Sequence, residues 1–146
     1  MRRALAAAFV TVAAAGVWIA AMPPASMRQP IDFPHVKHAG VACVVCHRGA
    51  ATSSRATIPD GAFCAKCHSA LPRTIAWVQV TRLPSHVNFS HRRHVSLANL
   101  DCVSCHGEMR ERRTPIGTPQ VQLTMTTCLS CHRQEGAAED CAACHR

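Results

Sequence analysis

The sequence predicts a mainly α-helical protein with much irregular chain, in which short helices surround five similar cysteine motifs and a hydrophobic helix precedes them. Two observations support this fold class. Ten cysteines occur among 146 residues, a share typical of a fold organised by covalent links or bound cofactors. Aromatic residues make up only 4%, so the large side chains that usually fill a small core are scarce. No sheet of any size is expected, and residues 75–80 could at most form a short extended segment.

The N-terminus carries a hydrophobic segment. Two arginines precede an uncharged stretch that reaches Met27 and has its apolar centre at residues 4–21. We expect residues 1–27 to form a signal-anchor helix, because no clear Ala-x-Ala cleavage site follows the apolar centre. A cleaved signal peptide, which would release a soluble exported form, is the alternative. The arginines predict that the N-terminus stays inside and that residues 28–146 lie on the periplasmic side of the bacterial inner membrane.

The exported body contains five copies of a Cys-x-x-Cys-His motif, which together use every cysteine. Motif 1 is Cys43, Cys46 and His47; motif 2 is Cys64, Cys67 and His68; motif 3 is Cys102, Cys105 and His106; motif 4 is Cys128, Cys131 and His132; motif 5 is Cys141, Cys144 and His145. This is the attachment signature of haem c, in which two thiols bind one porphyrin and the adjacent imidazole binds its iron. A disulfide framework does not explain the histidines, and zinc sites need an even number of such pairs. We therefore expect five covalent haem c groups with short helices wrapped around them.

Five histidines remain outside the motifs, one for each expected iron. They are His35, His38, His86, His91 and His94. We expect each iron to be six-coordinate, with one motif imidazole and one of these five. Methionine ligands and plain surface histidines are the alternatives. Six-coordinate irons leave no open position for a substrate, so the pattern predicts electron transfer and not an enzyme with its own substrate site.

A larger repeat contains these motifs. An Asx residue, a phenylalanine and two histidines precede motif 1 at Asp32, Phe33, His35 and His38, and precede motif 3 at Asn88, Phe89, His91 and His94. We expect residues 32–70 and 88–134 to be two halves with two attachment sites each, and residues 141–145 to add the fifth site. In each half the Asx residue could cap a helix that carries the histidine pair. Residues 51–61 and 114–119 are predicted loops.

The formal net charge is +8. Such a charge often indicates binding to nucleic acid or to an anionic membrane surface. Five haems, however, would bring on the order of ten propionate carboxylates, for which arginine is the natural partner. The basic excess is therefore explained by the expected cofactors, and we expect no nucleic-acid partner.

Two stretches carry a resemblance to known families. Phe33, His35 and His38 ahead of motif 1 resemble the class III multihaem cytochromes c. Residues 77–94, followed by motifs 3 and 4, resemble the pentahaem cytochrome subunit of alternative complex III and its relatives. The second resemblance implies a membrane-anchored, periplasmic pentahaem domain with bis-histidine irons. Its implied partners are iron–sulfur and integral-membrane subunits that oxidise quinol, and a downstream soluble cytochrome or oxidase.

The function that we expect is an electron-wire subunit of a membrane quinol-oxidising respiratory or photosynthetic complex. The alternative is a stand-alone class III-like cytochrome that shuttles electrons between a dehydrogenase and a reductase. A reductase of nitrogen oxyanions or hydroxylamine is disfavoured, because such enzymes need a five-coordinate haem and all five motifs here end in histidine. Five motifs and duplicated histidine pairs also argue against a tetrahaem quinol dehydrogenase.

Overall fold

The structure, a computed structural model, describes residues 26–145. The expected signal-anchor helix therefore lies outside the described residues, apart from Ser26 and Met27, which are not helical. Between residues 26 and 145, no helix is both long enough and apolar enough to cross a membrane.

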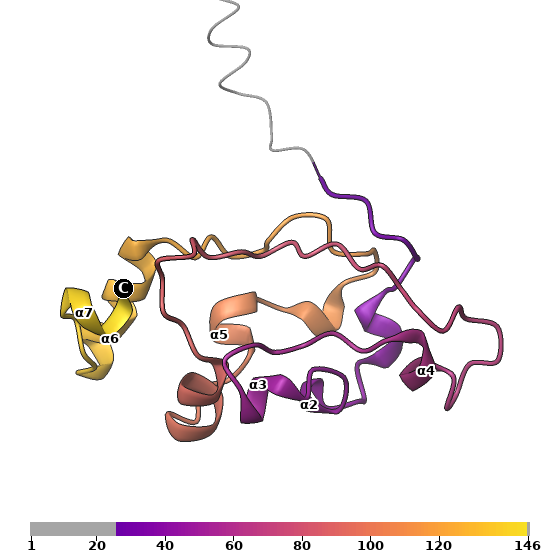
Figure 1. Ribbon diagram of the computed structural model, residues 1–146, viewed down its shortest axis with the longest axis horizontal. Helices are drawn as coiled ribbons and strands as arrows, with labels where there is room; N and C mark the ends of the chain where they lie inside the picture. The colour runs from indigo at the N-terminus through magenta and orange to yellow at the C-terminus, as the bar shows by residue number, and fades with distance from the viewer. Residues whose placement is uncertain (1–25, 146) are drawn as a thin grey trace, which may run out of the picture.

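Short helices joined by irregular chain make up the described part of the protein (Figure 1). They are η1 (His35–His38), α2 (Cys43–Cys46), α3 (Gly49–Thr52), α4 (Gly61–Cys64), η2 (Arg93–Leu97), α5 (Val103–His106), η3 (Met109–Glu111), α6 (Met125–Glu135) and α7 (Cys141–Cys144). Of these, η1 and η3 are 3₁₀-helices and η2 is a π-helix. No strand forms among these residues, and a single isolated antiparallel bridge joins Val87 to His145. The mainly helical and irregular fold class is thus confirmed for this part of the chain.

Polar side chains cap several of the helices that carry cysteine motifs. Asp60 precedes α4 and Asp140 precedes α7, and each carboxylate accepts a hydrogen bond of 2.9 Å from the backbone N–H three residues later. Thr124 caps α6 in a reciprocal capping box. The cap expected at Asp32 is wrong, because η1 begins only at His35 and Pro34 occupies the capping position without a side-chain bond. A capping side chain must directly precede the first helical residue to reach its free N–H groups.

The helices are spread along the long axis of the molecule. In Figure 1, α2, α3 and α5 lie near the middle, α4 lies at one end, and α6 and α7 lie at the other. Two irregular stretches run along the length of the view, and Gln29 links them. Its side-chain amide nitrogen donates to the carbonyl oxygens of Val78 and Ile116, both at 2.9 Å. The start of the described chain is thereby fixed against the body.

Side-chain packing supplies almost no hydrophobic core. Ala50 and Ile75 are the only buried hydrophobic residues among those described, and no large side chain in this part of the chain is fully buried. The valines between the motif cysteines are exposed, with Val45 at 45% and Val103 at 43%. An ordinary domain of this length buries layers of large apolar side chains. The fold therefore depends on other interactions, which centre on the cysteine motifs.

One glycine marks a close approach of two backbone segments. Gly61 begins α4, where an added Cβ atom would overlap the carbonyl group of Pro72. We expect Gly61→Ala to force a local backbone shift that costs about 1–3 kcal/mol of stability, measured as a lower midpoint of thermal unfolding. Gly40→Ala is the control, because a Cβ atom there meets nothing within 4 Å. Equal unfolding midpoints for the two variants would contradict the packing of α4 against Pro72.

Candidate metal centres

Each cysteine motif is closed by a turn of helix. In motifs 1, 2, 3 and 5 the backbone N–H of the motif histidine donates to the carbonyl of the first cysteine. These bonds are His47 N to Cys43 O (2.8 Å), His68 N to Cys64 O (3.0 Å), His106 N to Cys102 O (3.0 Å) and His145 N to Cys141 O (2.8 Å). Motif 4 lies within the longer helix α6. All ten cysteines are free thiols, so each pair is available to bind a cofactor.

Every motif histidine has one of the five remaining histidines as its neighbour. The distances between ring centres are 6.0 Å for His38 and His68, 5.4 Å for His86 and His145, 6.3 Å for His91 and His106, and 6.1 Å for His94 and His132. His35 is the neighbour of His47. Burial is the first cause that lowers the pKa of His35, and the nearby His47 imidazole is the second. No histidine is used in two of these pairs. The five expected distal ligands therefore meet five different motifs.

These separations fit one metal ion between two imidazoles. Two rings on opposite sides of one ion, with a metal–nitrogen distance of about 2.0 Å on each side, have their centres about 6 Å apart. Direct packing of aromatic rings covers the same range of distances. The one-to-one pairing favours metal sites over simple ring packing, because stacking gives no reason for each motif to take a different partner. The donor set, two neutral imidazoles beside two thiols, is that of haem c with bis-histidine iron.

The pairing follows the same rule in both halves. The first histidine of each pair, at 35 or 91, faces the first motif of its half, and the second, at 38 or 94, faces the second motif. His86, which stands outside the repeat, faces motif 5. The sequence predicts these five ligands but not their partners. The signal was present in the chain order, because histidines and motifs run in the same order within each half.

Two phenylalanines hold the histidine pairs in nearly identical geometry. The Phe33 ring meets His35 edge-on with a centre separation of 5.0 Å and stacks on His38 at 4.7 Å. The Phe89 ring meets His91 edge-on at 4.9 Å and stacks on His94 at 4.6 Å. Each phenylalanine thus fixes the planes of two imidazoles that face different motifs. The two phenylalanines thus hold equivalent places beside their histidine pairs, while the division into residues 32–70 and 88–134 stays a prediction.

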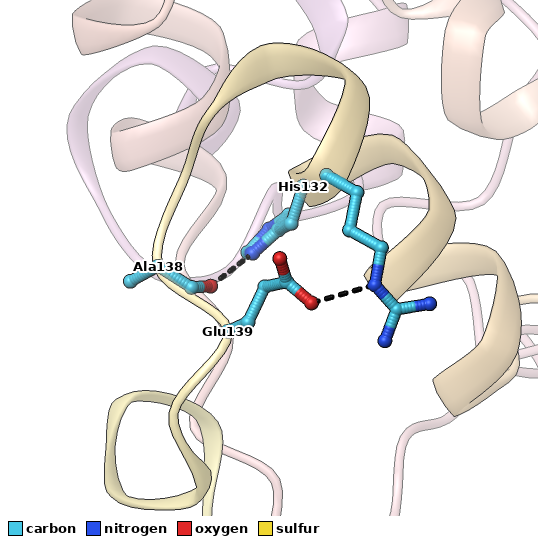
Figure 2. Close-up of polar contacts among 4 residues, drawn as sticks. His132, Ala138 and Glu139 are labelled. Atoms are coloured by element: carbon cyan, nitrogen blue, oxygen red, sulfur yellow. Dashed lines mark hydrogen bonds and ion pairs between the residues drawn. The ribbon is translucent and has the colours of Figure 1, made fainter.

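Hydrogen bonds set the tautomer of several imidazoles. The Nδ1 atoms of His47, His91, His94 and His132 lie 2.6–2.9 Å from backbone carbonyl oxygens. Figure 2 shows one of them, between His132 and Ala138. A carbonyl can only accept, so Nδ1 carries the proton and Nε2 keeps a lone pair for a metal. By contrast, the Nδ1 atoms of His35 and His38 are buried without a hydrogen-bond partner.

Burial shifts the pKa of one imidazole at motif 1 and one at motif 3. Burial is the main cause that lowers the pKa of His35, and the His47 imidazole lowers it further. Burial is also the main cause that lowers the pKa of His106, and the His91 imidazole adds to that shift. A lower pKa keeps these rings neutral, which is the form that binds a metal.

The cysteines at the same motifs behave in parallel. Burial raises the pKa of Cys46, Cys102 and Cys105, and in each case the next cause is a cysteine of another motif. The neighbouring pairs are Cys46 with Cys64, Cys102 with Cys43, and Cys105 with Cys131. Motifs that are separated in sequence therefore lie close together in space.

Comparisons with known proteins agree with covalent haem c at these motifs. Residues 87–146 match the family described as cytochrome c7 and related cytochrome c, and residues 14–76 match the class III cytochrome c family. One match covers motifs 1 and 2 and the other covers motifs 3 to 5. A curated relative, the multihaem cytochrome c subunit of a menaquinone reductase from Nitratidesulfovibrio vulgaris (strain Hildenborough), is 32% identical over 53% of this chain. That match covers 45% of the relative, so this chain spans about half of its length.

The contacts of Phe89 lead to a test of its role as a positioning residue. Phe89→Leu keeps an apolar side chain but removes the ring that holds His91 and His94. We expect altered electron paramagnetic resonance signals from two low-spin haems, because these signals depend on the orientation of the axial imidazole planes, with no loss of bound haem. Phe63→Leu is the control, because Phe63 lies against Arg48 and Lys66. Unchanged signals in the Phe89 variant would remove it from this role.

Proposed function

We propose that this multihaem c-type cytochrome, which takes part in electron transfer, carries five haems as the electron-wire subunit of a membrane complex that exchanges electrons with quinol. The observation that carries the proposal is the set of five histidine pairs, one at each Cys-x-x-Cys-His motif. Iron with two imidazole ligands has no free position for a substrate, so its role is to accept and donate single electrons.

The residues around motif 1 fit a haem beyond its iron ligands. Arg112 lies close enough to His35 to contribute to its lowered pKa, and the buried Nε atom of Arg112 has no protein acceptor. A buried guanidinium N–H without an acceptor is costly, and a carboxylate is its best partner. A haem propionate would supply that carboxylate.

The chain and the cofactor divide the work. Haem, when bound, supplies the one-electron redox chemistry. The protein positions ten imidazoles, keeps Nε2 unprotonated where Nδ1 donates to a carbonyl, and partly buries His35 at motif 1 and His106 at motif 3. It also lacks a core of its own in residues 26–145, which supports a fold in which porphyrins take the place of large apolar side chains.

The location and partners are part of the same proposal. An N-terminal anchor with its start inside would hold residues 28–146 at the periplasmic face of the inner membrane, the compartment in which haem c is attached. Met27, the last residue of the expected anchor segment, is tied to the body, since its backbone N–H donates to the Gly117 carbonyl at 2.9 Å. Support for a host complex comes from the relative described as a menaquinone reductase subunit and from the resemblance to alternative complex III.

Haem content is the first test. We expect mass spectrometry of the purified protein to show the chain mass plus five covalent haems, because each motif offers two free thiols and one histidine pair. Replacing both cysteines of a single motif by serine should remove one haem and leave four. A wild-type mass with three or fewer haems would overturn the proposal.

Association with a membrane complex is the second test. We expect the affinity-tagged full chain, extracted in mild detergent, to purify with iron–sulfur and integral-membrane subunits and to be reduced by added menaquinol. The control replaces residues 1–25 with a cleavable signal peptide, which should keep the haems but leave the membrane fraction. A full chain that always purifies alone would favour the stand-alone shuttle.

A further inference from the structure

We propose that the five sites form one linear electron path in the order 2–1–3–4–5, so that motifs 1 and 3 meet in the middle and motifs 2 and 5 are the two ends. The inference rests on the proposed function and adds the order of the sites and the points at which partners exchange electrons. With a haem held at each motif by its histidine pair, each step would move one electron from a reduced haem, which becomes oxidised, to an oxidised neighbour, which becomes reduced, and no bond would be made or broken.

Motifs 1 and 2 are joined by one short helix. η1 places His35 at motif 1 and His38 at motif 2, and residues three apart in a 3₁₀-helix lie one above the other. Residues that flank these two motifs are also in contact. The Arg48 guanidinium, directly after motif 1, lies 4.9 Å from the centre of the Phe63 ring, directly before motif 2.

Motifs 1 and 3 are brought together by two contacts. In each contact, the segment that follows one motif binds the histidine-bearing segment of the other half. In the segment that follows motif 1, the backbone carbonyls of three residues accept hydrogen bonds. The donors lie in the segment that carries the histidines of the second half. These bonds are His91 Nδ1 and N to Ser54 O (2.9 and 3.2 Å), Arg92 N to Ser53 O (2.9 Å) and Ser96 Oγ to Ala51 O (2.6 Å). The distal ligand of motif 3 is thus oriented by a carbonyl of the first half.

The same contact occurs in the reverse direction. The segment after motif 3 packs on η1, which carries the histidines of the first half. Val36 N–H donates to the Arg112 carbonyl at 2.9 Å, and the Arg110 guanidinium donates to the Ala39 carbonyl. Each half therefore supports the histidine helix of the other, and motifs 1 and 3 lie where the two halves meet.

Motifs 3 and 4 are connected in the same way as motifs 1 and 2, by one segment that carries a histidine for each motif. His91 and His94 face motifs 3 and 4 and share the Phe89 ring. Cys105 of motif 3 also lies near Cys131 of motif 4, as their electrostatic interaction shows.

Motifs 4 and 5 are joined by a short connection after α6. Figure 2 shows the His132 ring pointing to the Ala138 carbonyl, three residues before Cys141. The neighbouring Glu139 carboxylate accepts from Arg133 Nε at 2.7 Å, which ties the same connection back to α6. The chain that carries His86 also reaches motif 5, because the Cys144 carbonyl accepts from Asn88 N–H at 2.7 Å.

The ends of the path coincide with the ends of the molecule. α4, which ends at the first cysteine of motif 2, and α7, which begins motif 5, lie at opposite ends of the long axis in Figure 1, with α2 and α5 between them. Among the motif histidines His68 is exposed, whereas the other four are partly covered. His86, which faces motif 5, is exposed as well. The exposed imidazoles thus belong to motifs 2 and 5, where a partner protein can approach.

Two substitutions on η1 test this order against the order of the motifs in the chain. His35→Met and His38→Met each keep iron six-coordinate and raise the potential of one haem, so that partial reduction makes that haem alone ferrous and diamagnetic. Electron paramagnetic resonance then reports which ferric haems lose a magnetic neighbour. We expect two changed signals for His35→Met, since motif 1 lies between motifs 2 and 3, and one for His38→Met.

The reverse result, with one changed signal for His35→Met and two for His38→Met, would establish the chain order and overturn the proposal. Two further variants extend the test. We expect two changed signals for His91→Met, at motif 3, and one for His86→Met, at motif 5. If a methionine variant binds haem poorly, the alanine variant with carbon monoxide bound gives the same ferrous, diamagnetic site. A wild-type protein with fewer than five haems would instead refute the proposed function, so the two failures are distinguishable.

Discussion

The opposition of two imidazoles across about 6 Å is the constraint on which the rest of the structure depends. Each motif fixes one imidazole by a single turn of helix, but the second must come from another part of the chain. His86 and His145, for example, lie on either side of the second half in the sequence, and their rings are brought to 5.4 Å. Five such requirements leave little freedom for regular structure. The short helices, the long irregular connections and the lack of packed aliphatic layers in residues 26–145 all follow from this condition.

Much of the chemistry could be predicted from the sequence, because it depends on residue types at short spacing. Five Cys-x-x-Cys-His motifs and five further histidines gave the donor set without any knowledge of the fold. The partner of each distal histidine could not be derived, since His38 reaches His68 only through the long-range path of the chain. The Ser54 carbonyl that orients His91 is a backbone group and leaves no sequence signal at all. Local reasoning failed at Asp32, because the helix begins at His35, two residues later than a cap at Asp32 would place it.

The two halves are alike in their rings and different in their hydrogen bonds. Phe33 and Phe89 hold their histidines with separations that agree within 0.1 Å. The Nδ1 atoms of His91 and His94 nevertheless donate to carbonyls, while those of His35 and His38 are buried without partners. A hydrogen bond at Nδ1 makes an imidazole a stronger donor to its metal. Equal ligands in the two halves therefore do not imply equal iron sites.

The contact between the halves explains why the path differs from the order of the chain. If each half packed only on itself, motif 2 would lead to motif 3, as the sequence reads. Instead the segment after motif 1 supports the His91 helix, and the segment after motif 3 supports η1. This exchange brings the first motifs of the two halves together and turns the second motifs outward. A duplicated two-site unit thereby becomes a continuous path, and the fifth site extends it from the outward motif of the second half.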